Sequence, residues 1–251
     1  MLILLLHQVV SGQQISYSSS NGHAHNDYRY NQPFTQAHAI GFGSIEVDLL
    51  LLHDTLFIGH DTTEALKGIS FEKAYVETLM EAVRKNNGFV YPDTSKQLQL
   101  LIDLKTESGS TLMAVIKVLQ KFPLLTANRS VKFVITGKQP PGNQFDRYPS
   151  FIFFDGNFSD PLHFSKHLPS IALFSANFRQ YSKWNGVGKL NRKELITIRK
   201  LVRKSHDLHR PVRFWGAPDN PNTWRQLMKL KVDFINTDHI QEFANFIGTF
   251  R

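Results

Sequence analysis

The sequence contains no cysteine. Disulfide bonds, zinc sites with thiolate ligands and cysteine nucleophiles are therefore excluded, and any metal ion must be bound by oxygen or imidazole ligands. No segment approaches the roughly 20 consecutive apolar residues that a membrane-spanning helix needs. The chain also lacks internal repeats, low-complexity tracts and a recognisable interdomain linker. These absences favour one soluble globular unit whose chemistry depends on acids, histidines or hydroxyl groups.

The length and composition are those of a single folded domain. The chain has 251 residues, of which 41% are hydrophobic and 20% are charged, values typical of a soluble globular protein with a sizeable core. We expect one domain over residues 13–251.

Acidic residues are the minority among the charged ones. Lys and Arg number 29 against 21 for Asp and Glu, so the formal net charge is +8. Such an excess suits an anionic partner, but it is densest over residues 189–213, which we interpret mainly as a solvated helix face. We expect no nucleic-acid partner, and the oligomeric state stays open. Transient contact with a membrane surface is left open as well.

Residues 1–12 have the composition of a short secretory leader. An apolar run over residues 2–6 is followed by Val9-Val10 and then by the small residues Ser11 and Gly12. A basic start is missing and His7-Gln8 interrupts the apolar run, so the pattern is incomplete. We predict a secreted or periplasmic protein. A cytoplasmic protein with a buried first strand is the alternative, and cleavage of the leader is left open.

Past residue 20, short β-rich runs alternate with helical ones, a pattern typical of βα units around a parallel sheet. Strands are expected over residues 21–25, 43–50, 98–104, 131–136, 151–154, 170–175, 212–216 and 232–236. Eight such strands and a length near 250 residues predict an α/β fold, a single (β/α)8 TIM barrel.

Helices are expected between most of these strands. Their predicted ranges are 34–41, 71–87, 110–121, 191–207, 221–230 and 239–248. The segments after the fourth and fifth strands have weak helical patterns, so some barrel helices are expected to be short or missing. The long loops 137–150 and 175–189 follow strands, and in a TIM barrel such loops lie on the face where active sites are built. We therefore expect them to form walls of a substrate pocket.

Three acids occupy inward-facing positions near the ends of two predicted strands. Glu46 and Asp48 are two residues apart in an apolar run, so a strand places them on one face, and Asp103 repeats the pattern on the next strand. Unpaired buried carboxylates are costly. A shared divalent cation resolves the conflict, and three oxygen donors without thiolate favour Ca²⁺ or Mg²⁺ over zinc.

Two histidines are the best candidates for proton transfer. His25 ends the first predicted strand and His60 follows the run after the second, and imidazole titrates near neutral pH. Lys105, Arg213 and Asn236 also lie at strand ends, where they are suited to contact a phosphate group. His23 shares a strand face with His25 and is left undecided. Most other histidines are interpreted as structural or exposed.

The ordered motifs resemble a known family. They are Ala24-His25-Asn26-Asp27-Tyr28, Ser44-Ile45-Glu46-Val47-Asp48, Gly59-His60-Asp61, Leu101-Ile102-Asp103-Leu104-Lys105, Arg213-Phe214-Trp215 and Asn236-Thr237-Asp238. Together they resemble the phosphatidylinositol-specific phospholipase C-like phosphodiesterase superfamily. Within it, they are similar to the glycerophosphodiester phosphodiesterase-like branch that contains the altered-inheritance-of-mitochondria protein 6 group.

The resemblance implies a TIM barrel that hydrolyses phosphodiesters with one divalent cation, Ca²⁺ or Mg²⁺. It implies that His25 and His60 are catalytic, that Glu46, Asp48 and Asp103 bind the metal, and that Lys105 accompanies them. Asn26 stands where the glycerophosphodiesterase pattern has arginine, and Trp215 matches a late tryptophan of the sphingomyelinase D-like branch. We assign substrate binding to Asn26, Lys105, Arg213, Trp215 and Asn236.

Two rival functions stay open at this point. A zinc amidohydrolase also carries a His-x-His motif on its first barrel strand, as His23 and His25 do here, but it needs further histidines on later strands, and the predicted fourth to sixth strands end without one. A non-catalytic barrel that binds phosphorylated ligands is the other. The substrate is expected to be a small-molecule or lipid phosphodiester. Its alcohols, and whether water or a substrate hydroxyl attacks, are not specified by the sequence.

Overall fold

A computed structural model of the chain describes residues 16–158 and 167–249. The predicted leader over residues 1–12 lies outside these residues. Eight parallel strands are present: β1 (Gly22–Ala24), β2 (Ser44–Leu52), β4 (Leu98–Leu104), β5 (Val131–Gly137), β6 (Ile152–Asn157), β7 (Ile171–Asn177), β8 (Val212–Trp215) and β9 (Ile235–Thr237). Each predicted strand corresponds to one of them.

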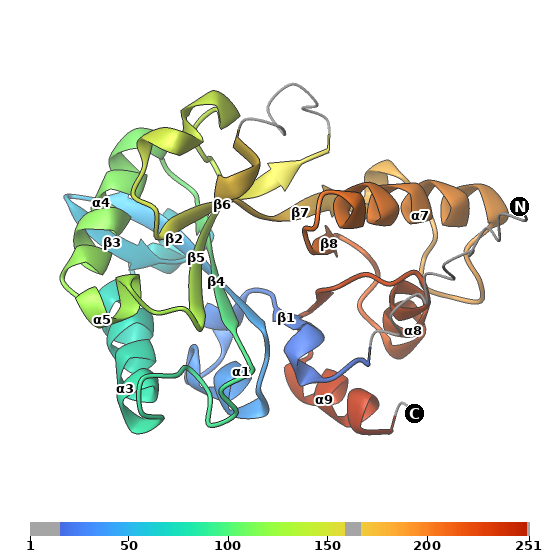
Figure 1. The fold of residues 1–251 in the computed structure, drawn as a ribbon, viewed down its shortest axis with the longest axis horizontal. Helices are drawn as coiled ribbons and strands as arrows, with labels where there is room; N and C mark the ends of the chain where they lie inside the picture. The colour runs from blue at the N-terminus through green and yellow to red at the C-terminus, as the bar shows by residue number, and fades with distance from the viewer. Residues whose placement is uncertain (1–15, 159–166, 250–251) are drawn as a thin grey trace, which may run out of the picture.

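The strands form a nearly closed ring (Figure 1). Their order is β8-β7-β6-β5-β4-β2-β1-β9, and a single parallel bridge between Arg213 and Phe234 joins the two ends, β8 and β9. Helices lie on the outside of the ring, as the order of strands and crossovers requires. The predicted (β/α)8 TIM barrel is thus confirmed.

Alternation along each strand separates the inside of the ring from the outside. In β4, Leu100 and Ile102 pack outward in the main core under the helices. Leu101 points inward, where it forms a small apolar cluster with Val134 and Leu173. Asp103 shares the inward face with Leu101, because side chains two residues apart in a strand lie on the same side. The inner apolar cluster therefore lies one step below the acids.

The main helices are α1 (Thr35–Ile40), α3 (Thr78–Lys85), α4 (Ser108–Gln120), α7 (Arg192–Asp207), α8 (Pro221–Lys229) and α9 (Ile240–Thr249). Two of them begin at strong caps. The Asn191 side chain accepts from Glu194 N ahead of α7. Asn220 caps α8, and Pro221 occupies its first turn. The weak helical pattern after the fourth predicted strand is also explained, because β5 is followed by a 3-10 segment, Gly142–Arg147, in place of a full helix.

Several features differ from the sequence-based expectation. Strand β3 (Thr55–Ile58) was not predicted, and it folds back antiparallel on β2. Two short helices, α2 (Thr62–Ala65) and α5 (Pro123–Thr126), were not predicted either. The expected helix 71–87 starts as a π-helical segment, Glu72–Glu77, and the last strand is shorter than predicted. No helix in the described part of the chain is both long and apolar enough to cross a bilayer.

Candidate active site

A cavity of about 620 Å³ opens at the carboxyl ends of the strands. This is the face where loops after barrel strands gather. All of the site residues predicted from the sequence line it except Asn236: His25, Asn26, Glu46, Asp48, His60, Asp103, Lys105, Arg213 and Trp215. The polar residues that the sequence places at the ends of strands therefore line one shared cavity.

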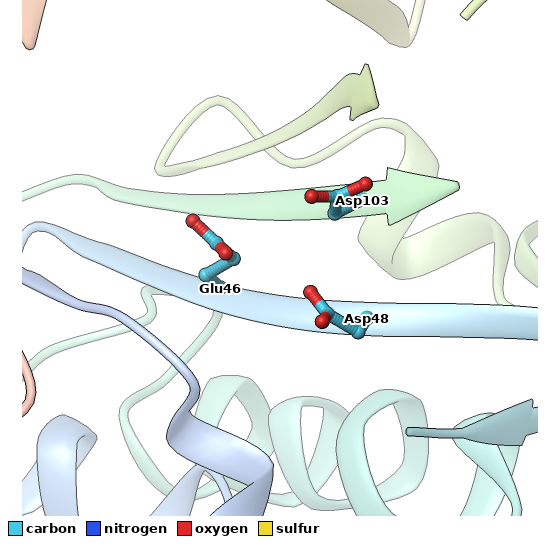
Figure 2. Close-up of side chains that lie close together, drawn as sticks. All are labelled: Glu46, Asp48 and Asp103. Atoms are coloured by element: carbon cyan, nitrogen blue, oxygen red, sulfur yellow. The ribbon is translucent and has the colours of Figure 1, made fainter. Parts of the chain in front are cut away.

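The three predicted metal ligands project from two neighbouring strands. Asp48 of β2 and Asp103 of β4 are partners in the strand register, and Glu46 lies two residues before Asp48. Figure 2 shows the three carboxylates on the same side of the two strands. Each offers one oxygen, and these oxygens all lie within 4.8 Å of one another. The predicted convergence of Glu46, Asp48 and Asp103 is present.

Lys105 neutralises only part of this negative charge. Its Nζ donates to Asp103 Oδ2 at 2.7 Å and lies 3.2 Å from Asp48 Oδ2. The other oxygens, Asp48 Oδ1 and Asp103 Oδ1, are buried and have no hydrogen-bond partner among the described residues. Burial, reinforced by the charge of Glu46, raises the pKa of Asp48 to about 7 against the opposing charge of Lys105. Burial likewise raises the pKa of Asp103.

Glu46 has a different environment. Its burial disfavours ionisation, but Arg213 Nη1 donates to Oε2 at 2.6 Å and outweighs that cost, so the pKa of Glu46 is lowered. His23 Nε2 lies 2.8 Å from the same oxygen, and the Ser44 hydroxyl lies 2.7 Å from His23 Nδ1. Burial and Arg213 lower the pKa of His23 to about 3, which keeps this imidazole neutral. Glu46 is therefore the acid held as a carboxylate.

His25 is oriented by a second acid. Its Nδ1–H donates to Asp238 Oδ1 at 2.8 Å, and Nε2 lies 3.7 Å from Glu46 Oε1. Burial lowers the pKa of His25, but the hydrogen bond to Asp238 and the charge of Glu46 raise it by more. Asn26 Nδ2 also donates to Asp238 Oδ1, at 3.1 Å. With Nδ1 occupied, Nε2 is the nitrogen of His25 that is free to exchange a proton in the cavity.

His60 reaches the cavity from the unpredicted hairpin. Strand β3 runs back along β2, and Gly59 N donates to Asp48 O at 3.1 Å. This places His60 beside the acids, and its side chain is exposed to the cavity. The hairpin therefore brings the second histidine of the predicted pair into the site.

The acid cluster fits a hard divalent cation. Two oxygens on one Ca²⁺ lie at most about 5 Å apart, twice the usual distance of 2.3 to 2.6 Å, and the three acids satisfy this limit with their 4.8 Å separation. Two of the three present a buried oxygen without a hydrogen-bond partner in the described part of the chain. Every donor is a carboxylate oxygen, the donor type that Ca²⁺ and Mg²⁺ prefer.

Arg213 and Asn236 lie deeper than the sequence suggested. The Arg213 side chain is 5% exposed and is used mainly by Glu46, although it still lines the cavity. Asn236 does not line the cavity, and its Oδ1 lies 3.5 Å from Arg213 Nη1. Contact of these two side chains with substrate stays a prediction. In the structure, Arg213 pairs with Glu46 and lies where β8 meets β9.

The far wall of the cavity includes residues of the loops 137–150 and 175–189, as expected, but few of its side chains were singled out from the sequence. It contains Asp155 and Thr136, whose hydroxyl donates to Asp155 Oδ2 at 3.1 Å. Burial raises the pKa of Asp155 to about 6 in spite of Arg213. The predicted strand 151–154 ended three residues too early, since β6 extends to Asn157. Further along the wall lie Ser175, Gln180, Tyr181 and Trp215, of which Trp215 is 42% exposed.

The comparisons with known proteins find similarity to phosphodiesterase families. The family described as "AIM6-like phosphodiesterase domain" matches residues 15–127. The "Glycerophosphoryl diester phosphodiesterase family" matches residues 211–241. The two matches contain the acids, both histidines and Arg213.

Among individual proteins, the chain is similar to altered inheritance of mitochondria protein 6 of several fungi. It is 28% identical to the homolog from Arthroderma benhamiae over 257 residues, covering 87% of this chain and 81% of that protein. It is 28% identical to the protein from Kluyveromyces lactis over 304 residues, covering 90% and 72%. The predicted resemblance to this group of glycerophosphodiester phosphodiesterase-like proteins is confirmed.

A solved structure supports the fold. The crystal structure of a glycerophosphodiester phosphodiesterase from Parabacteroides distasonis matches with a TM-score of 0.58 over 92% of this chain and 95% of that one. The sequence identity is 12%, so the likeness concerns the barrel and not the substrate.

Proposed function

We propose that this protein is a metal-dependent phosphoric diester hydrolase that acts on a glycerophosphodiester or phospholipid-type substrate. One divalent cation, Ca²⁺ or Mg²⁺, would be held by Glu46, Asp48 and Asp103, and His25 and His60 would transfer protons. The observation that carries the proposal is the pair of buried, unpartnered oxygens on Asp48 and Asp103, which lie in the same cavity as both histidines.

The two histidines approach the cavity from different elements. His25 comes from the end of β1 and His60 from the turn after β3, so one imidazole can take a proton while the other gives one. The hydrogen bond to Asp238 fixes the ring of His25 with Nε2 toward the cavity and stabilises its protonated form. His25 is thereby suited to donate a proton to a leaving alcohol.

The charged residues prepare the site for an anion. When bound, a divalent cation neutralises phosphate charge and polarises the phosphorus centre. Arg213 keeps Glu46 ionised, and Lys105 neutralises the outer oxygens of Asp48 and Asp103. Lys105 is about one-fifth exposed, so its ammonium group can also face a phosphate oxygen. Asn26 and Trp215 line the same cavity and complete the proposed substrate contacts.

The test is hydrolysis of bis(p-nitrophenyl) phosphate and a panel of glycerophosphodiesters by the parent protein, His25→Ala and His60→Ala, with and without chelator. Each substitution should lower kcat by roughly 10²- to 10⁴-fold, and chelation should abolish turnover until Ca²⁺ or Mg²⁺ is restored. His53→Asn is the matched control, because His53 lies at the exposed tip of the same hairpin in a left-handed conformation that Asn tolerates. A cyclic phosphate product would identify an internal hydroxyl as the nucleophile.

Two results would count against the proposed activity. Hydrolysis that ignores chelator and both substitutions would contradict the proposal, whereas cation binding without turnover of any diester would support the non-catalytic alternative. The zinc amidohydrolase alternative is disfavoured, because His23 is fully buried and both its ring nitrogens contact Ser44 or Glu46. In the described ranges, the acid triad is the one cluster with the spacing of a metal site.

A further inference from the structure

Two apolar side chains are unusually exposed. Leu66 and Val187 are 77% and 74% exposed, the highest values among the large hydrophobic residues that the structure describes. Each stands alone beside lysine: Lys67 follows Leu66, and Val187 lies between Lys183 and Lys189. Single exposed apolar residues are common on proteins, but these two differ in how the backbone holds them and in where they lie.

The backbone around Val187 is held firmly by side chains. Val187 N donates to Asn185 Oδ1 at 3.1 Å, and Val187 O accepts from Trp184 Nε1 at 2.7 Å. Asn222 Nδ2 donates to the carbonyl groups of both flanking glycines, Gly186 and Gly188, at 2.8 Å. Both glycines have positive φ, +91° and +66°, the region that favours glycine. The turn is thus ordered while its one apolar side chain faces outward.

This turn lies on the same side of the barrel as the cavity. A Cβ on Gly186 would contact Pro218 and Asn220, and these residues belong to the segment that follows β8. That strand ends at Trp215, which lines the cavity and is 42% exposed. Val187 is therefore presented close to the rim of the active site.

Leu66 belongs to the rim as well. It follows α2, whose N-cap Asp61 comes directly after His60, and Arg29 is paired with Glu64 of α2 at 3.4 Å between Nη2 and Oε1. Both His60 and Arg29 line the cavity. The two most exposed apolar side chains thus flank one opening, from elements that are far apart in sequence.

The charge around the Val187 turn has one sign. Residues 179–193 contain five basic residues and no acidic one: Arg179, Lys183, Lys189, Arg192 and Lys193. All five are exposed. Arg179 Nη1 donates to Trp184 O, and the side chains of the other four form no ion pair in the described ranges, although Lys183 N donates to Glu194 Oε1 at 3.1 Å. Membrane lipids with anionic headgroups attract such clusters.

We propose that this rim, defined as Leu66, Lys67, Lys183, Val187 and Lys189, docks on an anionic phospholipid surface. A protein partner would need a contiguous patch of roughly 800 Å² on this chain, whereas the rim offers two separate apolar tips with cations beside them. Such tips suit insertion between lipid headgroups. Docking does not require turnover. Joined to the proposed function, it would bring the cavity to phospholipid-type diesters.

The test is cosedimentation of the full chain with vesicles of phosphatidylcholine alone or of phosphatidylcholine with phosphatidylserine. We expect binding to the anionic vesicles that weakens with salt. Val187→Ser should weaken it by about tenfold, and Lys183→Gln with Lys189→Gln by roughly 25-fold, about fivefold for each lysine. Lys85→Gln with Lys229→Gln is the matched control, because these exposed lysines end α3 and α8, at the opposite end of the barrel.

Turnover of a soluble substrate distinguishes this inference from the proposed function. None of Lys183, Val187 and Lys189 lines the cavity, so hydrolysis of bis(p-nitrophenyl) phosphate should be unchanged in these variants. Absence of binding to anionic vesicles at low salt would overturn the inference. So would equal losses in the rim and control variants, or a dimer in solution that Val187→Ser dissociates, because a second copy would then cover the rim.

Discussion

Asp48 is a buried carboxylate beside two other carboxylates, with one lysine to offset them. Its Oδ2 accepts from the Tyr28 hydroxyl at 3.0 Å and lies 3.2 Å from Lys105 Nζ, whereas Oδ1 has no partner in the described part of the chain. A buried charge without compensation lowers the stability of the fold. Asp48 therefore lowers the stability of the metal-free fold and is suited to bind a cation.

Replacing Asp48 with Asn should separate these two effects. The amide oxygen can still accept from Tyr28 and Lys105, but the uncompensated charge is removed. We expect the affinity for Ca²⁺ or Mg²⁺ to fall by at least about tenfold, since affinity follows ligand charge, while the metal-free protein unfolds at an equal or higher denaturant concentration. Isothermal titration calorimetry and chemical denaturation measure the two quantities.

Asp155→Asn serves as the control, because Asp155 lines the same cavity but is not one of the triad. Its effect on cation affinity should be small. If Asp48→Asn bound the cation as tightly as the parent protein does, the triad would not be the metal site.

Gly137 shapes the space around Asp103. Its φ is +73°, and a Cβ at this position would overlap Asp103 Oδ1. Gly137→Ala should therefore cost roughly 1 to 2 kcal/mol for the left-handed backbone and should also displace the carboxylate and weaken cation binding. Gly68→Ala is a close control, with φ +74° and no atom within 4 Å of the new Cβ. Denaturation should respond to both variants, but a cation titration to Gly137→Ala alone.

Individual residues show what the sequence could and could not predict. Glu46, Asp48 and Asp103 followed from strand alternation, because the inward face is a local property of each strand. The contacts of Arg213 with Glu46 and of His25 with Asp238 could not be predicted. They join residues far apart in sequence, and their distances depend on how the ring closes.

Among the elements, the β2–β3 hairpin is the informative difference. Residues 43–50 were expected to form one parallel strand, but β2 continues to Leu52 and the left-handed residues His53 and Asp54 turn the chain back. Asp tolerates this conformation through its short polar side chain, but His-Asp is a weak turn motif next to the usual Asn-Gly. The sequence therefore predicted the role of His60 through its motif, and not the hairpin that positions it.

The buried Asp27 links two elements of the fold. Its Oδ2 accepts from Tyr75 Oη at 2.7 Å and from Phe34 N, so it joins the segment after β1 to the helix outside it. Burial raises the pKa of Asp27 to about 6, against the opposing effect of these two hydrogen bonds. The folded state therefore holds this proton more tightly than the unfolded chain does.

This difference predicts a pH dependence of stability. The contribution of Asp27 is fully present below pH 4 and is lost as the pH rises through about 6. Its size is roughly 3 kcal/mol, from 1.36 kcal/mol per pKa unit. Asp27→Asn, whose amide oxygen can accept both hydrogen bonds, should remove that part of the slope. Urea denaturation at pH 4, 5, 6 and 7 measures the difference between the variant and the parent protein, and parallel slopes would contradict the assignment.

For the whole molecule, a cation bound only by the folded state adds to its stability. At a free concentration of 100 times Kd, the gain is about 2.7 kcal/mol, or roughly 5 to 10 °C in Tm for a chain of this length. Thermal unfolding with added Ca²⁺ or Mg²⁺ should show this rise in the parent protein and little of it in Asp48→Asn. An equal rise in both proteins would place the cation elsewhere.

In the ring of strands, β8 and β9 have the weakest pairing, a single bridge between Arg213 and Phe234. Arg213 is also the counter-ion of Glu46, across the barrel on β2. Separation of the last two strands would therefore leave a buried carboxylate facing a neutral imidazole. Residues 15–127, the part matched by the AIM6-like phosphodiesterase family, carry the three proposed metal ligands and both proposed catalytic histidines. They nevertheless depend on the C-terminal third of the chain for the charge that keeps Glu46 ionised.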